Sequence, residues 1–329
     1  MTAGIAAVGL PLAFWDKADL SWLDHLLSTF DRTLLLLPGS DRPRSSHQHP
    51  LTIHERQDFL ASVYGPALSE GRLVCAPMVD EPYRPGLRLA ACREAVDQAF
   101  GHGSEPVFVA RTEAQGDELA RFLPGVAPAI REFGGARPAA SLFGKLELPE
   151  KASLWFSRWR RTTAAERMAA EHKDCVAFQR TWRGSPFPPT FNAGDAIVIC
   201  GDEILLIERD NWPFKGLLAL PGGFLERWET LFDAALREAA EEVRVKREDL
   251  EKLLRGSRTL DYPWRDPRGR FISQAYLFIL KEKPVGLKAG SDAKGFRWEK
   301  WAELSPQDLA FDHWHAIREL LEAVALQTG

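Results

Sequence analysis

A carboxylate-rich segment in the C-terminal half constrains the fold of this chain more than any other feature. On a helix, Glu238, Glu241 and Glu242 are spaced i, i+3 and i+4, so they share one face within an arc of about 100°. Like charges at this spacing cost roughly a few tenths of a kcal/mol per pair, and the cost disappears if divalent cations lie between them. Clustered carboxylates supply the oxygen ligands that Mg²⁺ and Mn²⁺ prefer. The pattern therefore indicates a metal-binding helix face.

The residues around this face favour a helix that packs on a sheet. Arg237 lies four residues before Glu241, close enough to pair with it and fix its orientation. A solvated helix rich in glutamate is the alternative, and it is the commoner explanation of a bare Glu-x-x-Glu-Glu. Here a tight Pro-Gly-Gly turn at 221–223 precedes the helix and can bring backbone carbonyls near the carboxylates. The residues available to pack on a sheet are Leu231, Ala234, Ala235, Leu236 and Ala239.

The composition is that of a soluble globular protein, with 45% hydrophobic and 27% charged residues. A length of 329 residues predicts two domains. The net charge of −4 argues against broad nonspecific nucleic-acid binding, and no apolar run reaches the length of a membrane span. The N-terminus lacks the basic leader of a signal peptide. No Cys-x-x-Cys pair occurs, so disulfides and a zinc site are not expected and a reducing cytoplasm fits the four cysteines, Cys75, Cys92, Cys175 and Cys200.

The N-terminal half alternates between apolar runs and helical periodicity. This rhythm of strand, helix and strand predicts a parallel α/β sheet of the Rossmann-like, nucleotide-binding type, which we assign to residues 1–150. Strands are expected at 5–10, 33–37, 72–77 and 106–110, and helices at 18–30, 53–64 and 89–100.

The C-terminal half is predicted to be a mixed α/β domain at 183–329, reached through a connecting helical segment at 151–182. Three prolines within 183–190 break regular structure between the two. The domain is expected to contain a hairpin at 195–200 and 203–208, the carboxylate helix at 229–244, strands at 271–280 and 296–301, and a last helix at 313–326.

The segment from Gly223 to Val245 resembles the Nudix box. That box reads Gly, five residues, Glu, seven residues, Arg-Glu, an aliphatic, any residue, Glu-Glu, any residue, Gly and an aliphatic. Every charged position and the first glycine are present. The aliphatic position holds the small Ala239, and Arg244 replaces the last glycine. Because that glycine serves the helix exit, we expect an altered helix end with metal ligation retained.

The resemblance implies an α/β/α sandwich in which Mg²⁺ or Mn²⁺ bridges a pyrophosphate. It implies that Glu229 assists the site and that Arg237 orients the glutamates. The box does not fix the general base. Asp292, in a loop before the strand at 296–301, is a candidate for the base or for an extra metal ligand. A solvent-exposed turn is an equally good explanation of Asp292. The metal ligands implied are Glu238, Glu241, Glu242 and the carbonyl of Gly222.

From Pro188 to His313 the chain resembles the Nudix half of bifunctional nicotinamide-mononucleotide adenylyltransferase/ADP-ribose pyrophosphatases. The matching pieces occur in the correct order at 186–191, 216–224, 261–270, 291–293 and 312–313. The resemblance implies cleavage of ADP-ribose to AMP and ribose 5-phosphate, and it allows a homodimer. Substrate contacts are expected from a basic cluster and from His313, although an exposed basic hairpin and a capped helix start are the alternatives; the cluster comprises Arg265, Arg268 and Arg270.

The segment 39–56 resembles the adenylyltransferase domain of the same proteins, but the residues that such chemistry needs are missing. The His-x-Gly-His positions fall on Trp15, Asp16, Lys17 and Ala18. The Ser/Thr-rich turn and a Gly-His-x-Lys-Asp signature are absent at 139–145 and 110–114. Without them the charge stabilisation of phosphoryl transfer is lost. We therefore expect a catalytically silent relative of that domain, and His47, His49 and His54 do not restore it.

Two alternatives to a hydrolase remain. The first is nicotinamide-mononucleotide adenylyltransferase activity, which the missing histidines oppose. The second is a noncatalytic nucleotide sensor, as in Nudix-related transcription regulators. Those regulators usually append a winged helix, for which the short segment after His313 has no room, and the intact glutamates favour catalysis.

Overall fold

The computed structural model describes residues 5–9, 17–39, 51–79, 81–110, 113–122, 129–130, 147–243, 247–284 and 293–328. The side chain of Glu242 lies outside the described set, as do Asp292, Arg244, His47 and His49. Within the described residues, no helix is both long and apolar enough to cross a membrane. The chain divides into two compact units, Met1–Ala169 (unit 1) and Ala170–Gly329 (unit 2), which are described separately below.

Unit 1 contains a parallel sheet, which confirms the predicted Rossmann-like architecture. Its described strands follow the order β3-β2-β1-β4-β5, and every pair is parallel. The chain thus extends the sheet first to one side of β1 and then to the other, as in doubly wound folds. The strands are β1 (Ile5–Gly9), β2 (Arg32–Pro38), β3 (Leu73–Met78), β4 (Val107–Ala110) and β5 (Ala129–Ile130).

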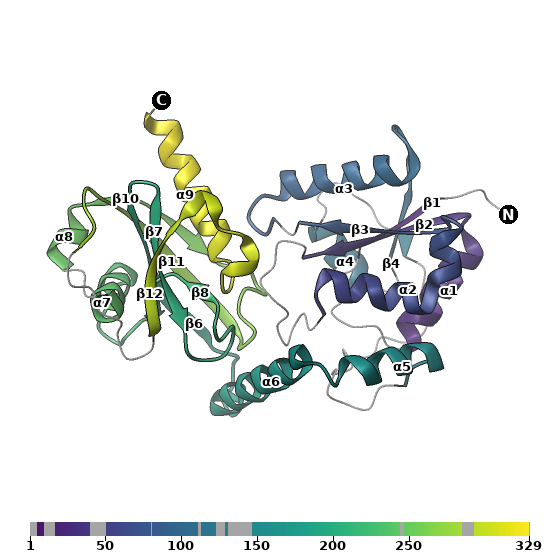
Figure 1. The fold of residues 1–329 in the computed structure, drawn as a ribbon, viewed down its shortest axis with the longest axis horizontal. Helices are drawn as coiled ribbons and strands as arrows, with labels where there is room; N and C mark the ends of the chain where they lie inside the picture. Colours follow the sequence, from purple (N-terminus) through teal and green to yellow (C-terminus); the bar gives the residue numbers. More distant parts are fainter. Residues whose placement is uncertain are drawn as a thin grey trace. The chain divides into compact units, whose positions relative to one another are not determined.

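Helices cover both faces of this sheet (Figure 1). On one side, Leu35 and Leu37 of β2 pack with residues of α1, α2 and α5. On the other side, Leu34 and Leu36 pack with residues of α3 and α4. Because successive strand residues point to opposite faces, a strand buried on both sides needs a continuous apolar run, which residues 34–37 provide. The helices are α1 (Lys17–Thr29), α2 (Ile53–Ser69), α3 (Pro85–Phe100), α4 (Glu113–Phe122) and α5 (Glu150–Trp159).

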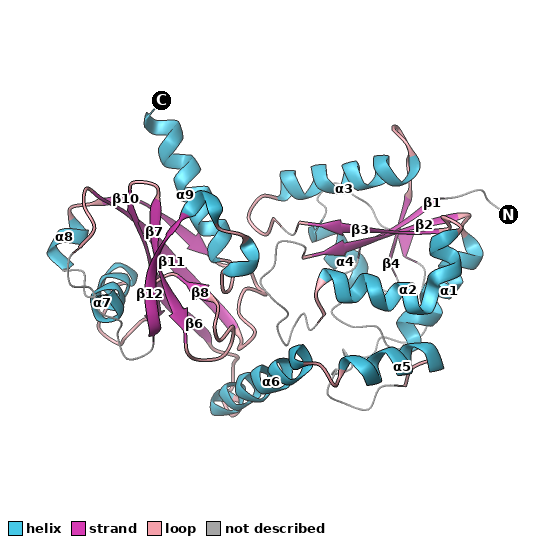
Figure 2. Ribbon diagram, viewed as in Figure 1, coloured by secondary structure: helices cyan, strands magenta, loops and turns pink. Residues whose placement is uncertain are grey.

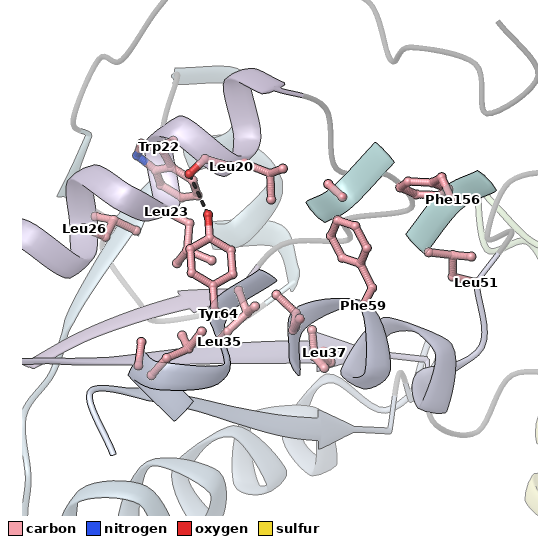
Figure 3. Close-up of a cluster of buried hydrophobic side chains, with 14 of the residues drawn as sticks. Leu20, Trp22, Leu23, Leu26, Leu35, Leu37, Leu51, Phe59, Tyr64 and Phe156 are labelled. Atoms are coloured by element: carbon pink, nitrogen blue, oxygen red, sulfur yellow. Dashed lines mark hydrogen bonds between the residues drawn. The ribbon is translucent and has the colours of Figure 1, made fainter. Parts of the chain in front are cut away.

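The core beside β2 also contains polar side chains that form hydrogen bonds. The Tyr64 hydroxyl of α2 donates to the carbonyl of Leu20 in α1 at 2.9 Å. Figure 3 draws this hydrogen bond as a dashed line. In addition, Trp159 of α5 donates its indole N–H to Glu55 at 2.7 Å. Glu55 is also part of the capping box with Thr52 that begins α2.

The predicted connecting segment consists of two helices, α5 and α6 (Thr163–Trp182). The break at 160–162 coincides with a new cap, because the Thr162 hydroxyl accepts from the backbone N–H of Ala165 at 3.3 Å. The division between the two units falls inside α6, so this helix contributes residues to both.

Unit 2 is built on a mixed sheet whose described strands follow the order β10-β11-β6-β7-β12 (Figure 2). Strands β6 and β11 pair in parallel along their full length, and the predicted hairpin of β6 and β7 is confirmed. Its turn uses Gly201 at a φ of +63°, a conformation that glycine adopts readily. The strands are β6 (Thr190–Cys200), β7 (Glu203–Arg209), β8 (Leu218–Ala219), β9 (Gly222–Phe224), β10 (Leu254–Leu260), β11 (Arg270–Leu280) and β12 (Ala293–Lys300).

Two helices of unit 2 lie against opposite faces of its sheet. Leu236 and Ala239 of α7 pack with Ala196 and Val198 of β6. Asp195 points to the other face, toward the side chain of His313, which is the first residue of the last helix. The helices are α7 (Leu231–Val243), α8 (Arg247–Glu251) and α9 (His313–Thr328).

Candidate functional site

The carboxylate helix α7 begins at Leu231 because a capping pair precedes it. The Thr230 hydroxyl accepts from the backbone N–H of Asp233 at 3.1 Å, and the Asp233 carboxylate accepts from the backbone N–H of Thr230 at 3.0 Å. The Thr230 hydroxyl also donates to the Asp233 carboxylate at 2.6 Å. This hydrogen bond, followed by those from the Thr230 backbone N–H and from Arg247, lowers the pKa of Asp233 to about 2. Glu229 therefore lies just outside the helix, in the turn that leads into it.

Small residues bring α7 very close to strand β6. Ala234 and Ala235 are fully buried on the inner side of the helix. Opposite them, Gly194 lies so near that a Cβ on it would overlap the carbonyl oxygen of Leu231 and lie 2.7 Å from the backbone nitrogen of Ala235. This close approach fixes which side of α7 faces the sheet. The glutamates are consequently presented along the edge of the contact.

Arg237 connects the charged residues of the site. Its guanidinium donates to both carboxylate oxygens of Glu229, at 2.6 and 3.1 Å, and to Glu238 at 2.7 Å. It also donates to Glu241 at 3.3 Å and to the carbonyl of Phe224 in β9 at 3.0 Å. The planar fork of arginine suits such multiple contacts. One side chain thus ties the turn, the helix and strand β9 together.

The two described carboxylates of the helix face differ in their surroundings. The side chain of Glu238 is 15% exposed and that of Glu241 is 60% exposed. Burial raises the pKa of Glu238, although the hydrogen bond from Arg237 opposes this effect. For Glu229 the hydrogen bond from Arg237 is the largest effect, and it lowers the pKa. A nearby cation would favour the charged form of Glu238 against the effect of burial.

Strand β9 provides space for the Glu238 carboxylate. A Cβ on Gly223 would overlap that carboxylate directly, so only glycine leaves room for it. The neighbouring Gly222 is equally confined, but by Asp195 on the other side of the strand. Glycine at both positions thus lets side-chain oxygens lie against the backbone of β9.

These residues fit a hard divalent cation. Glu238 and Glu241 offer carboxylate oxygens from one side of α7, and the Glu238 carboxylate lies against Gly223, the neighbour of Gly222. Among the described side chains, which do not include Glu242, no three His, Cys, Asp or Glu residues form a metal-holding group. The helical position of Glu242, one residue beyond Glu241, places its backbone at the same end of α7.

The sequence alone does not indicate a role for Asp195, which the structure brings to this region. It is 6% exposed, and its carboxylate accepts a hydrogen bond from the Ser273 hydroxyl. His313 is also buried, and its Nδ1 accepts from the backbone N–H of Leu220 at 3.1 Å. Desolvation lowers the pKa of His313 to about 4. The only signal in the sequence was a charged residue at the start of an apolar run, which also suits a strand boundary.

The three arginines predicted to contact substrate have partners within unit 2. Arg265 forms a buried two-pronged ion pair with Asp312, with Nη2 to Oδ1 at 2.7 Å. Arg268 pairs with Asp266 at 2.7 Å and lies over aromatic rings, the nearest being Phe271, at 4.7 Å from the ring centroid. Arg270 donates Nη1 to the carbonyl of Asp261 at 2.6 Å.

The sheet order of both units and the position of the carboxylate helix define a two-unit α/β protein. A Rossmann-like unit is followed by an α/β/α sandwich, in which helices cover both faces of a mixed sheet. Residues 190–320 match the family model of the NUDIX domain. The chain is also similar to the ADP-ribose pyrophosphatase of Methanocaldococcus jannaschii, at 41% identity over 129 residues, which cover 39% of this chain and 72% of that protein. The chain belongs to the Nudix family, and unit 2 carries the hydrolase domain that defines it.

Two further comparisons extend this result. The ADPR responsive transcriptional repressor NtrR of Acinetobacter baylyi is 28% identical over 149 residues, which cover 44% of this chain and 58% of that protein. A solved structure from Francisella tularensis, a bifunctional NMN adenylyltransferase/ADP ribose pyrophosphatase complexed with AMP and a Mn ion, superposes with a TM-score of 0.84. It covers 98% of this chain and 99% of its own at 23% identity, so it shows that the two-unit fold is shared.

Proposed function

We propose that this protein hydrolyses ADP-ribose to AMP and ribose 5-phosphate with Mg²⁺ or Mn²⁺ as cofactor. The observation that carries the proposal is the set of carboxylates that Arg237 holds against strand β9. The substrate class follows from the similarity to the archaeal ADP-ribose pyrophosphatase. The four cysteines are free, which suits the reducing cytoplasm where we place the protein.

In this proposal Glu238, Glu241 and Glu242 hold the metal, together with the carbonyl of Gly222. The cation, when bound, neutralises the diphosphate, lowers the pKa of a bound water and stabilises the leaving phosphate. Arg237 keeps the carboxylates oriented, and Glu229 holds Arg237 in place by a two-pronged hydrogen bond. The described contacts therefore order the ligands before a metal arrives.

For the general base and the substrate contacts we propose residues other than the glutamates of α7. Asp292 is our candidate for the base. Among the predicted substrate contacts, Arg270 has one described hydrogen bond, which leaves much of its guanidinium available for a phosphate or ribose. We propose that Arg265 and Arg268 act indirectly, because their ion pairs with Asp312 and Asp266 hold the 261–270 segment in its conformation. Buried His313 is proposed to support the site without direct contact with substrate.

The experiment is a product analysis by HPLC on a panel of nucleotide diphosphates with Mg²⁺ or Mn²⁺. The panel contains ADP-ribose, NADH, a diadenosine polyphosphate and a nucleotide sugar. We expect wild type to release AMP from ADP-ribose fastest and Glu242→Gln to lose this activity.

The matched control is Glu248→Gln, which removes a carboxylate from the exposed part of α8 and should leave the rate unchanged. Faster turnover of another member of the panel would overturn the assignment of ADP-ribose as substrate but would leave the proposed hydrolysis reaction standing. Wild-type turnover by Glu242→Gln would overturn the assignment of the metal-binding face.

A further inference from the structure

Strand β9 is enclosed by a carboxylate on each side. Gly223 faces α7, where the Glu238 carboxylate occupies the space that its side chain would need. Gly222 faces the opposite way, and there the Oδ1 atom of Asp195 occupies the corresponding space. Asp195 is the direct cross-strand partner of Gly222, so the antiparallel pairing of β6 and β9 holds the two together.

Asp195 is held in this position by fixed contacts. Its other oxygen, Oδ2, accepts from the Ser273 hydroxyl, and Ser273 is fully buried in the neighbouring strand β11. The Nε2 atom of His313 lies 3.9 Å from the same oxygen. Since Nδ1 of His313 accepts from the backbone N–H of Leu220, the imidazole is neutral and its proton is on Nε2, facing Asp195.

The charged carboxylate of Asp195 lowers the stability of the fold in this environment. It is buried, and its neighbours Ser273 and His313 are neutral, so neither offsets its charge fully. An amide of the same shape would accept the hydrogen bond from Ser273 without that cost. A positive charge placed on the far side of Gly222 would offset it. This is the position where the proposed function places the metal.

We propose that Asp195 is a positioning residue for the metal site, acting through Gly222, and that Ser273 and His313 orient it. This inference rests on the proposed function. The carboxylate fixes the backbone of Gly222, whose carbonyl is a candidate ligand, and adds a negative charge behind it. Groups that orient metal ligands and tune their charge commonly change metal affinity by about ten- to a hundredfold when mutated.

The test is Mn²⁺ binding to the full-length protein without substrate, measured by isothermal titration calorimetry. In Asp195→Asn the dissociation constant for Mn²⁺ should rise about tenfold or more, with the melting temperature retained. Ser273→Ala keeps the charge but loses its orientation, and a smaller increase is expected. The matched control is Asp210→Asn, which removes an exposed carboxylate paired with Lys215 and should bind Mn²⁺ as wild type does.

A folded Asp195→Asn protein with the wild-type dissociation constant would overturn the inference. If that variant fails to fold, Ser273→Ala decides, and unchanged binding by it would overturn the inference equally. Glu238→Gln separates this result from the proposed function. Loss of Mn²⁺ binding in Glu238→Gln alongside normal binding in Asp195→Asn would remove the role of Asp195 only, whereas normal binding in Glu238→Gln would remove both.

Discussion

Arg237 and Gly223 show how single residues prepare the site. Arg237 gathers Glu229, Glu238 and Glu241 with one guanidinium, and Gly223 leaves the space that Glu238 fills. Both act on the position of a carboxylate. Since hard cations bind carboxylate oxygens within a narrow range of distances, a small displacement of Glu238 should have a large effect on metal binding.

Gly223→Ala tests this directly. The new methyl group would overlap the Glu238 carboxylate, so we expect the side chain to move and ADP-ribose turnover to fall about ten- to a hundredfold. The measurement is kcat at saturating Mn²⁺, with the melting temperature as a check on folding. Gly295→Ala is the control, because a Cβ there meets no atom within 4 Å. Full activity of the Gly223→Ala enzyme would contradict the role assigned to this space.

At this scale the sequence predicts the glutamates and Arg237 because their spacing on a helix determines which residues share a face. It did not predict the role of Asp195, whose partners Ser273 and His313 are distant in sequence. For the same reason, the ion pair between Arg265 and Asp312 was not foreseen. A guanidinium that looks available in the sequence can be committed to a carboxylate that only the fold brings near.

Among the elements, the contact between β6 and α7 depends on the absence of a side chain at Gly194. In Gly194→Ala the methyl group would lie 2.7 Å from the backbone nitrogen of Ala235 and 3.2 Å from the Ala234 side chain. Backbone cannot rotate away as a side chain can, so we expect unit 2 to lose about 1–3 kcal/mol of stability. Urea unfolding measures this loss. Gly256→Ala in β10 meets only a leucine methyl at 3.5 Å and should unfold nearly as wild type does; equal stability of both variants would contradict the close contact.

The start of α9 predicts a pH-dependent stability. Desolvation holds the pKa of His313 at about 4, below the ordinary value of 6.5. Between these values the unfolded state binds the proton and the folded state does not, so stability falls as the pH decreases from about 6.5 to about 4. Between pH 7 and pH 5 the protonation of this group should lower the free energy of unfolding by about 2 kcal/mol. In urea unfolding, His313→Gln should lack this part of the pH dependence; an unchanged dependence would show that the imidazole is not the cause.

Long elements were predictable and short ones were not. The apolar run of β2 and the periodicity of α7 extend over enough residues for a pattern to emerge. Strands β8 and β9 have two and three residues, too few for any periodicity, yet β9 carries the glycines of the site. Helix α7 starts two residues later than predicted because the Thr230–Asp233 cap determines its first turn.

At the scale of the whole molecule, two units share one chain, and we propose that unit 2 alone carries out chemistry. Unit 1 has the doubly wound sheet, but residues 15–18 read Trp-Asp-Lys-Ala where the resemblance to adenylyltransferases expects His-x-Gly-His, whose imidazoles would stabilise a triphosphate. We therefore expect no NAD above the protein-free control when the full chain is incubated with nicotinamide mononucleotide, ATP and Mg²⁺. Chromatography with NAD detection measures this, and steady accumulation of NAD would show that unit 1 is an active transferase.

The most direct measurement is AMP release from ADP-ribose by the full-length protein, treated with EDTA and then supplied with Mn²⁺. Wild type should lose activity in EDTA and regain it with Mn²⁺, because the reaction depends on the cation. Glu238→Gln should remain about ten- to a hundredfold slower at every Mn²⁺ concentration that supports wild type. Hydrolysis that persists in EDTA, or a Glu238→Gln enzyme as fast as wild type, would contradict a metal-dependent hydrolase built on the carboxylate face of α7.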